Sequence, residues 1–468
     1  MSAPFRQGMI CSTSFFHAVS NYLRIIFICV LFLPDMVLCG NTHSHDNFFA
    51  DDGNSGILPS ETRPESDNIY RNGGESGWKA NPSVIKEMEE RRPVFMWHEN
   101  EVPEYELPDP LERSDGTIIS SVENWKLHRP GILEIFRKDM YGRRPGLPDE
   151  LTFNLVREDI SAMDGAATLR IIEIHSAHEG RDHIFELIIF LPNQFEEPVP
   201  VFLLMNNRSP DNTDPTRQEK SGFWPAEEVI ERGYGIAAIQ NQDLAPDDHE
   251  KYREGIIRLF EGDAAMGKRP PDAWKGIAAW GWGASRAMDY FETDNRIDCS
   301  RVAILGHSRG GKASLWAGAE DKRFALVISN NSGCGGAALS KRRYGETVEN
   351  VNWYTHWFAD NFKRFNNRED KLHFDQHMLL ALIAPRALYI ASADMDLWAD
   401  PRGEFLALAN ASPVFGLWSH PPIDPEDMPP LDEPLFSGPL GYHIRSGGHN
   451  LTRVDWHYFM DFADRIWR

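Results

Sequence analysis

The sequence contains few cysteines and is short of positive charge. Five of its 468 residues are cysteine, and Cys11, Cys29 and Cys39 lie within the first 40 residues. Cys299 and Cys334 could form one disulfide, but two cysteines alone cannot establish it. No cluster of cysteine and histidine has the spacing of a zinc site.

Lys and Arg number 48 against 70 Asp and Glu, a net charge of −22. Because nucleic acid is held by clustered Lys and Arg, we expect no nucleic-acid partner.

Internal repeats and heptad patterns are absent, and the apolar run at Ile25–Leu33 (IIFICVLFL) is too short to span a bilayer comfortably. The run follows Arg24 and has the length of a signal-peptide core. We therefore predict a signal peptide over residues 1–40, export to the periplasm or the cell exterior, and no stable membrane span after its removal. Lipid anchoring at Cys39 is a weaker alternative, because Leu38 stands where a small residue is expected.

The remaining composition is that of a large globular protein. Hydrophobic residues make up 41% of the chain, with 14 Trp and 27 Phe available for a core. Residues 41–95 are rich in Gly, Ser, Asn, Asp and Glu, which predicts a flexible linker. Residues 96–468 are then expected to form a single, monomeric catalytic domain.

Short apolar stretches alternate with helical patterns along this domain. Two β-type stretches, 167–175 and 183–191, predict an antiparallel pair of strands. Further strands are expected at 200–205, 235–240, 301–305, 324–329, 387–391 and 442–445, and helices at 121–141, 225–232, 274–293, 312–319, 379–382 and 456–466. Such alternation predicts an α/β fold, with a mostly parallel central sheet sandwiched by helices. The initial antiparallel pair suits the sheet edge of an α/β-hydrolase.

A nucleophile motif lies between a predicted strand and a predicted helix. Gly306–Gly310 (GHSRG) fits the pattern G-x-S-x-G, which on its own is a weak signal. Here it directly follows the strand at 301–305 and precedes the helix near Lys312, which is the setting that a nucleophile elbow needs. Ser308 is therefore the candidate nucleophile, at a helix N-terminus that favours developing negative charge.

A nucleophilic serine needs a base and an orienting acid, which follow it in the order acid, then histidine, in this fold. His449 comes after a Gly-rich turn near the C-terminus and is the expected base; His443 and His457 are the other histidines in that region. Three carboxylates compete for the acid role after the strand at 387–391, namely Asp394, Asp396 and Asp400.

Several further motifs resemble those of the glucuronoyl esterases, family fifteen of the carbohydrate esterases, in their bacterial form. The resemblance extends from about Tyr105 to the C-terminus. Its motifs are GHSRGGK (306–312), LWAGA (315–319), NSGCGGAAL (331–339), GETV (345–348), DQH (375–377), IAPR (383–386), WADP (398–401) and GHN (448–450). Members of this family cleave the ester between 4-O-methyl-glucuronic acid on xylan and an alcohol of lignin.

The resemblance implies a role for each matching residue. Ser308 would be the nucleophile and His449 the base, while Arg309 would stabilise the oxyanion. Three other residues would hold the uronate ring: Lys312 and Glu346 through sugar hydroxyls, and Trp398 by stacking or hydrogen bonding. Each of the three also has a plain structural interpretation, as a solvated helix residue (Lys312), a surface carboxylate (Glu346) and a core residue (Trp398).

One position departs from the family pattern. Many bacterial members carry a glutamate at the position of Asn331, where it serves as, or shares, the catalytic acid. An amide can hold an imidazole by a hydrogen bond but cannot stabilise imidazolium by charge. The acid role is therefore expected to fall to Asp396. The loop Met205–Arg208 (MNNR) also differs from the Gly-containing loop of relatives.

Three functions remain open at this point. The favoured one is a secreted serine esterase that acts on polysaccharide-linked glucuronoyl esters through an acyl-enzyme on Ser308. Such hydrolysis needs only water, so no metal or organic cofactor is expected. A carbohydrate deacetylase of the same fold is the second reading, although a small acyl group would not need Lys312, Glu346 and Trp398 together. A weakly active or inactive glycan-binding relative is the third, and Asn331 is its only support.

Overall fold

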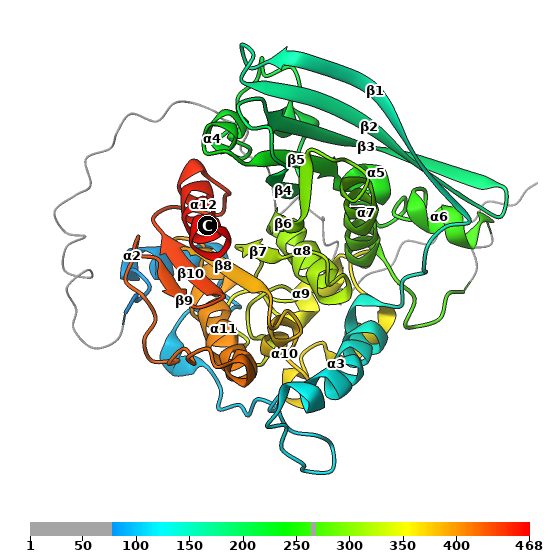
Figure 1. The fold of residues 1–468 in the computed structure, drawn as a ribbon. Helices are drawn as coiled ribbons and strands as arrows, with labels where there is room; N and C mark the ends of the chain where they lie inside the picture. The colour runs from blue at the N-terminus through cyan, green and yellow to red at the C-terminus, as the bar shows by residue number, and fades with distance from the viewer. Residues whose placement is uncertain (1–76, 264–267) are drawn as a thin grey trace, which may run out of the picture. The chain divides into compact units, whose positions relative to one another are not determined.

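The computed structural model describes residues 77–263 and 268–468. A ten-stranded sheet forms the centre of this part of the chain (Figure 1). Its strand order is β1-β2-β3-β5-β4-β6-β7-β8-β10-β9. Neighbouring strands from β5 to β10 run parallel. At one edge β1, β2 and β3 pair antiparallel, and at the other β9 pairs antiparallel with β10. The arrangement confirms the predicted α/β class with an antiparallel edge.

Eight of the ten strands in the described residues lie close to predicted positions, and β1 and β9 were not predicted. Their bounds are β1 (Glu150–Ala162), β2 (Ala167–His178), β3 (Arg181–Pro192), β4 (Val199–Asn206), β5 (Gly235–Gln240), β6 (Ile297–His307), β7 (Leu326–Asn330), β8 (Ala387–Ala393), β9 (Leu435–Ser437) and β10 (Leu440–Arg445). The α-helices are α2 (Pro82–Arg91), α3 (Val122–Phe136), α4 (Ala226–Glu231), α5 (Asn241–Leu244), α6 (Ile256–Glu261), α7 (Gly276–Phe291), α8 (Arg309–Glu320), α9 (Val348–Trp353), α10 (Gln376–Ala381), α11 (Pro401–Phe415) and α12 (Arg453–Trp467).

The sheet separates two apolar cores, because successive side chains of a strand point to opposite faces. On β6, Val302 and Ile304 belong to the larger core together with residues of α7, α8 and α10. The alternate residues Ala303 and Leu305 belong to the smaller core, with residues of α4 and α12. Burial on both faces explains why the parallel strands read as continuous apolar runs in the sequence.

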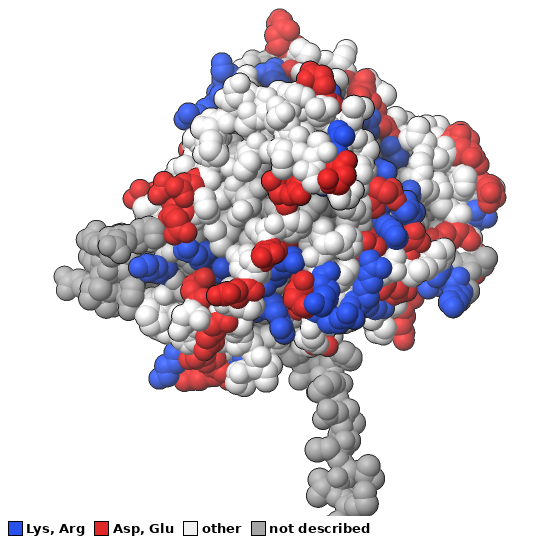
Figure 2. Space-filling model, turned by 90° about the horizontal axis from the view of Figure 1, so that it is seen from below, with Lys and Arg blue, Asp and Glu red and all other residues white. Residues whose placement is uncertain are grey.

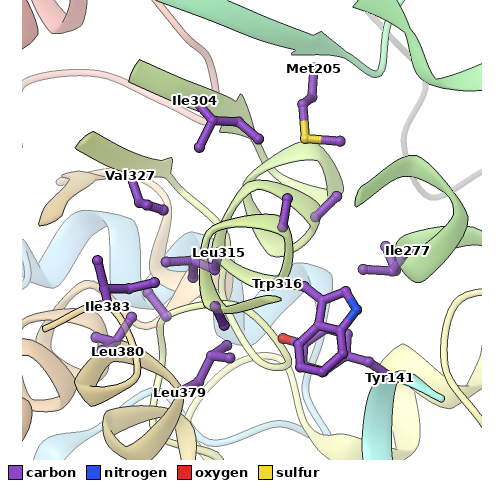
Figure 3. Packing of buried hydrophobic residues seen from close by; sticks show 14 of the residues in the cluster. Tyr141, Met205, Ile277, Ile304, Leu315, Trp316, Val327, Leu379, Leu380 and Ile383 are labelled. Atoms are coloured by element: carbon purple, nitrogen blue, oxygen red, sulfur yellow. The ribbon is translucent and has the colours of Figure 1, made fainter. Parts of the chain in front are cut away.

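Helix α8, which follows the expected nucleophile, is held firmly in the larger core. Its residues Leu315 and Trp316 are fully buried. Figure 3 shows Leu315 among side chains of the strands and of α10, including Val327 and Leu379. The ring of Trp316 stacks on Tyr141, with 4.4 Å between the ring centroids and 9° between the planes. This packing fixes the start of α8 relative to the sheet.

Some elements were not predicted. Strand β1 is mostly exposed, so its sequence gives little apolar signal. Within the expected linker (41–95), residues 82–91 form helix α2, which Asn81 caps and which buries Val84 and Met88 one turn apart. Two buried positions are too few to stand out in a polar sequence. Residues 1–40, the expected signal peptide, and 41–76 lie outside the described residues.

The two cysteines outside the N-terminal region do not pair: Cys299 is exposed and Cys334 is buried. No helix between residues 77 and 468, as far as these are described, is both long and apolar enough to cross a membrane. On the face shown in Figure 2, basic side chains lie among acidic ones.

Candidate active site

Ser308 occupies a strained turn between β6 and α8. Its backbone has φ 56° and ψ −127°, a conformation that non-glycine residues rarely adopt and that concentrates at functional sites. The flanking glycines are required by close backbone approach. A Cβ on Gly306 would come within 2.1 Å of the carbonyl oxygen of Gly310, and a Cβ on Gly310 within 2.8 Å of that of Met205. The predicted nucleophile elbow is therefore formed.

His449 and Asp396 are brought together by two neighbouring strands. Asp396 follows β8 and His449 follows β10, and these strands are parallel, so the segments after them start at the same edge of the sheet. His449 Nδ1 lies 2.6 Å from Asp396 Oδ2. The carboxylate is buried, whereas the imidazole is 26% exposed. The pair therefore has the arrangement of a catalytic base and its orienting acid.

Asn331, in the loop after β7, contacts the same carboxylate. Its side-chain Nδ2 donates a hydrogen bond of 2.9 Å to Asp396 Oδ2. Burial alone would raise the pKa of Asp396, but the charge and hydrogen bond of His449 and the hydrogen bond of Asn331 lower it below its usual value. Asp396 is thus held as a carboxylate beside the imidazole.

The competing carboxylates and histidines have other partners. Asp400 caps helix α11 and forms a buried ion pair of 2.8 Å with Arg342. Asp394 accepts a hydrogen bond of 2.7 Å from the backbone N–H of Gly447, in the turn that leads to His449. His443 is fully buried 3.0 Å from Asp455, and His457 lies on α12, 2.9 Å from Glu228. Asp396 is the candidate that lies within hydrogen-bond distance of His449 Nδ1, at 2.6 Å.

Arg309 is fixed beside the nucleophile by partners on the neighbouring loops. Its Nη2 donates a hydrogen bond of 2.9 Å to the carbonyl oxygen of Asn207, and its Nε forms an ion pair with Asp247. Burial would raise the pKa of Asp247, but hydrogen bonding to His356 and Trp357 and the charge of Arg309 lower it to about 2. A permanent anion thus holds the guanidinium, which is suited to stabilise negative charge developing near Ser308.

Lys312, on helix α8, and Glu346, in the loop before α9, form a buried ion pair. Their side chains are 3% and 6% exposed, and Lys312 Nζ lies 2.9 Å from Glu346 Oε2. The ammonium also donates to the carbonyl oxygens of Ser332 and Cys334, at 2.7 and 2.5 Å. Neither residue is therefore a solvated surface charge. Three protein acceptors match the three N–H donors of the lysine, so a bound sugar would share or replace one of them.

Trp398 is partly buried and contacts residues 92–95, at the end of the expected linker. The guanidinium carbon of Arg92 is 3.9 Å from the centroid of its ring. The ring of Phe95 meets it edge to face, with 4.9 Å between centroids. These contacts cover part of the indole, so any stacking on a sugar ring uses what remains. The apolar residues Phe95, at the end of the expected linker, and Trp97, just after it, were the only sequence sign of this role.

A further contact that the sequence did not reveal joins the two loops that carry Ser308 and His449. Arg208 Nη1 donates a hydrogen bond of 2.8 Å to Oδ1 of Asn450, the residue after His449. Its Nη2 lies 3.5 Å from Nε2 of His307, the residue before Ser308. Arg208 belongs to the loop singled out by its sequence MNNR, which is the only signal that could have pointed to it.

Taken together, the described residues can carry out acyl transfer. A strained serine, a histidine paired with a buried aspartate and a fixed arginine supply a nucleophile, a base and charge stabilisation. In the two described stretches of the chain, no group of three or more His, Cys, Asp or Glu side chains is placed to hold a metal ion.

Comparison with known proteins agrees with this chemistry. Residues 174–418 match the family model described as "Glucuronyl esterase, fungi". The chain is 39% identical over 416 residues to carbohydrate esterase MZ0003 from an unknown prokaryotic organism, which covers 83% of this chain and 94% of that protein. It is 26% identical over 321 residues to a 4-O-methyl-glucuronoyl methylesterase of Schizophyllum commune, covering 66% of this chain and 72% of that protein.

Among solved structures, the chain is similar to a glucuronoyl esterase from Solibacter usitatus. The superposition has a TM-score of 0.73 at 38% sequence identity, and it covers 79% of this chain and 100% of the other. The similarity therefore extends over the whole of that protein.

Proposed function

The chain belongs to the glucuronoyl esterase family, and from this premise we propose that it is a serine esterase that hydrolyses 4-O-methyl-glucuronoyl esters linking glucuronoxylan to lignin. Its sheet and helices are those of the α/β-hydrolase fold of this family. The observation that carries the proposal is the pairing of His449 with the buried Asp396. The ring of His449 lies 4.4 Å, between centroids, from that of His307, the residue before the strained Ser308.

In the proposed mechanism, Ser308 Oγ attacks the ester carbonyl while His449 accepts its proton. The negative charge that develops on the carbonyl oxygen is stabilised by the backbone N–H and guanidinium of Arg309. His449 then returns the proton to the departing alcohol, leaving a glucuronoyl ester on Ser308. Water, deprotonated by His449, attacks this ester and releases the uronic acid. Asp396 holds the imidazole and stabilises its protonated form in both steps.

The choice of a uronate over a small acyl group is supported by the residues next to this machinery. Glu346 and Lys312 form a buried pair close to the loop after Asn331, and Trp398 contributes a partly exposed ring. We propose that Glu346 and Lys312 bind sugar hydroxyls and that Trp398 lies against the sugar ring. Deacetylation remains the alternative, and the test below distinguishes it.

The apolar run at Ile25–Leu33 supports export of the protein, since a polymeric substrate must be met outside the cytoplasm. We propose that residues 1–40 are removed on export and that the chain acts in the periplasm or outside the cell.

The test is hydrolysis of benzyl glucuronate, with 4-nitrophenyl acetate in parallel, by the wild type and its Ser308→Ala and Asp396→Ala variants. Turnover of the glucuronate that is lost in both variants supports the esterase and both residues. Turnover of the glucuronate that persists in Asp396→Ala would support the esterase function but overturn the role of Asp396. Hydrolysis of the acetate alone would favour the deacetylase, and hydrolysis of neither ester would favour a glycan-binding protein.

A further inference from the structure

A cavity of about 440 Å³ lies between the segment Val94–Met96 and helix α9. Thr347, Asn350, Trp353 and Asn367 are among the residues that line it. Its volume falls within the range of ligand pockets, roughly 300–1,000 Å³. None of the residues assigned to the uronate site lines this cavity, so it is a separate space.

The cavity adjoins the proposed uronate site at two points. Thr347, which lines it, directly follows Glu346 in the chain. Phe95, which also lines it, presents its ring to Trp398 with 4.9 Å between centroids. The segment is fixed in this place by a hydrogen bond of 3.1 Å from the N–H of Gly345 to the carbonyl oxygen of Met96. Phe95 therefore contacts both Trp398 and the cavity.

Trp353 gives the cavity its chemical character. It is 51% exposed, and it is the only exposed tryptophan in the described part of the chain. Tryptophan is enriched at binding surfaces, because its ring offers a large apolar face together with a polar N–H. Hydroxyl and amide side chains, those of Thr347, Asn350 and Asn367, surround it. An apolar ring face with neutral polar groups around it complements a sugar, which has apolar C–H faces and a rim of hydroxyls.

We propose that this cavity is a subsite for the neutral sugars of the polysaccharide backbone, with the ring of Trp353 stacking on one of them. The inference rests on the proposed function, because a glucuronate bound at Glu346 and Trp398 is attached to a backbone that must continue over adjoining surface. The two charged residues that line the cavity, Arg343 and Glu349, have opposite signs, which suits an uncharged chain.

The other described cavities fit this role less well. One is lined by Tyr252 together with several basic residues: Arg253, Lys268, Arg269 and Lys275. The next shares Tyr252, Arg253 and Lys275 and adds Lys363. Their tyrosine is buried, and neither is lined by Glu346, Trp398 or a neighbour of these residues in the chain. Their basic lining favours anions over neutral sugars.

The experiment compares two substrates in the full-length wild type and in Trp353→Ala. One is benzyl glucuronate, and the other is the same ester of a glucuronic acid carried on a xylo-oligosaccharide. We expect Trp353→Ala to lower the ratio of kcat/KM for the oligosaccharide ester to that for benzyl glucuronate by about three- to tenfold, through KM. Trp353→Phe, which keeps an aromatic ring, should retain most of the ratio. Leu127→Ala, at a 75% exposed apolar residue of α3, is the control for loss of an exposed side chain.

A ratio that Trp353→Ala leaves unchanged would overturn the subsite, as would an equal fall in Leu127→Ala. If the wild type hydrolyses neither ester, the proposed function fails. The sugar subsite is then tested separately, by measuring oligosaccharide binding. In that case xylohexaose is titrated into Ser308→Ala and into Ser308→Ala with Trp353→Ala, and binding is followed by calorimetry. Weaker binding in the second protein supports the subsite, whereas equal binding or none in both overturns it.

Discussion

The side-chain amide of Asn331 donates a hydrogen bond of 2.9 Å to Oδ2 of Asp396. That oxygen is also the one that lies 2.6 Å from Nδ1 of His449. The amide thus takes the place where an acid would stand in many relatives, and it supports an acid supplied by another strand. Because Asn331 lies beside the oxygen that faces the imidazole, a carboxylate at this position could reach the same nitrogen.

This geometry predicts that the acid role can be moved from Asp396 to position 331. We expect Asp396→Ala to lower kcat on benzyl glucuronate by about 10³- to 10⁴-fold, as loss of a triad acid does elsewhere. Adding Asn331→Glu to this variant should restore at least about tenfold, because a carboxylate again faces His449. Asn331→Gln in the same background supplies length without charge and should restore nothing. Steady-state kinetics checks the series, and a folded double variant with no recovery would contradict it.

A second prediction concerns Glu404, which is buried on α11 beneath the loop that carries Asn331. Its Oε1 accepts hydrogen bonds from the backbone N–H groups of Ser332 and Gly333, at 2.8 and 3.0 Å, and Ser392 Oγ contacts its Oε2 at 2.6 Å. Burial raises the pKa of Glu404 to about 8, although these hydrogen bonds oppose the rise. The ordinary value is 4.5, so between about pH 4.5 and 8 the folded protein holds a proton that the unfolded chain has lost.

Stability must therefore fall as pH rises through this window, and the loss from Glu404 is complete above it. Glu404→Gln mimics the protonated acid, since its carbonyl oxygen can still accept and its amide can donate to Ser392. We expect the variant to lose less stability than the wild type between pH 5 and pH 9 in urea unfolding. Parallel stability curves for the two proteins would show that Glu404 does not carry the proton.

A third prediction follows from Arg208, whose guanidinium contacts the neighbours of both Ser308 and His449 through His307 and Asn450. If this contact aligns the nucleophile with the base, Arg208→Ala should lower kcat by about tenfold with little change in KM, since small misplacements of reacting groups are costly. Asn450→Ala should do the same, and the double variant should lose no more than either single variant. Additive losses would instead mean that the two residues act independently.

Much of the fold follows from the apolar pattern because the parallel strands are buried on both faces. The runs at β4, β6, β7 and β8 stand out in the sequence for that reason. Strand β1 does not, since most of its residues face solvent. Helix α11 was also missed, although it is mostly buried, because apolar residues lie on all sides of it and give no clear period.

The proposed catalytic residues could be predicted where they stand at strand ends, because the order of strands fixes which loops meet. Ser308 and His449 each follow a recognisable strand. Ser308 lies in a G-x-S-x-G motif, and His449 follows a Gly-rich turn, so each stands out from its neighbours. Asp396 could not be separated from Asp394 and Asp400 by position alone. The three differ only in their contacts, which depend on Arg342, Gly447 and His449, residues far away in the sequence.

Arg92 shows the same limit, since its partner Trp398 lies about 300 residues away in the sequence and no pattern links them. Its pKa is lowered by burial, while the carboxylates of Glu346 and Asp396 act to raise it, so its charge lies within reach of the proposed sugar site. The N-terminal segment therefore contributes a cation and an aromatic contact to the wall of that site. The family model begins only at residue 174, so this contribution lies outside the part it matches.

We expect Arg92→Ala to raise KM for benzyl glucuronate by about three- to tenfold with a smaller effect on kcat, because loss of the cation–π contact frees the Trp398 ring that bounds the sugar. Arg92→Lys keeps the charge without the planar group and should fall between the wild type and alanine. The matched control is Arg91→Ala, since Arg91 is the adjacent residue of α2, is 66% exposed and pairs only with Glu87 in the described contacts. If Arg91→Ala raises KM as much as Arg92→Ala does, the effect comes from α2 as a whole, and the guanidinium of Arg92 has no particular role beside Trp398.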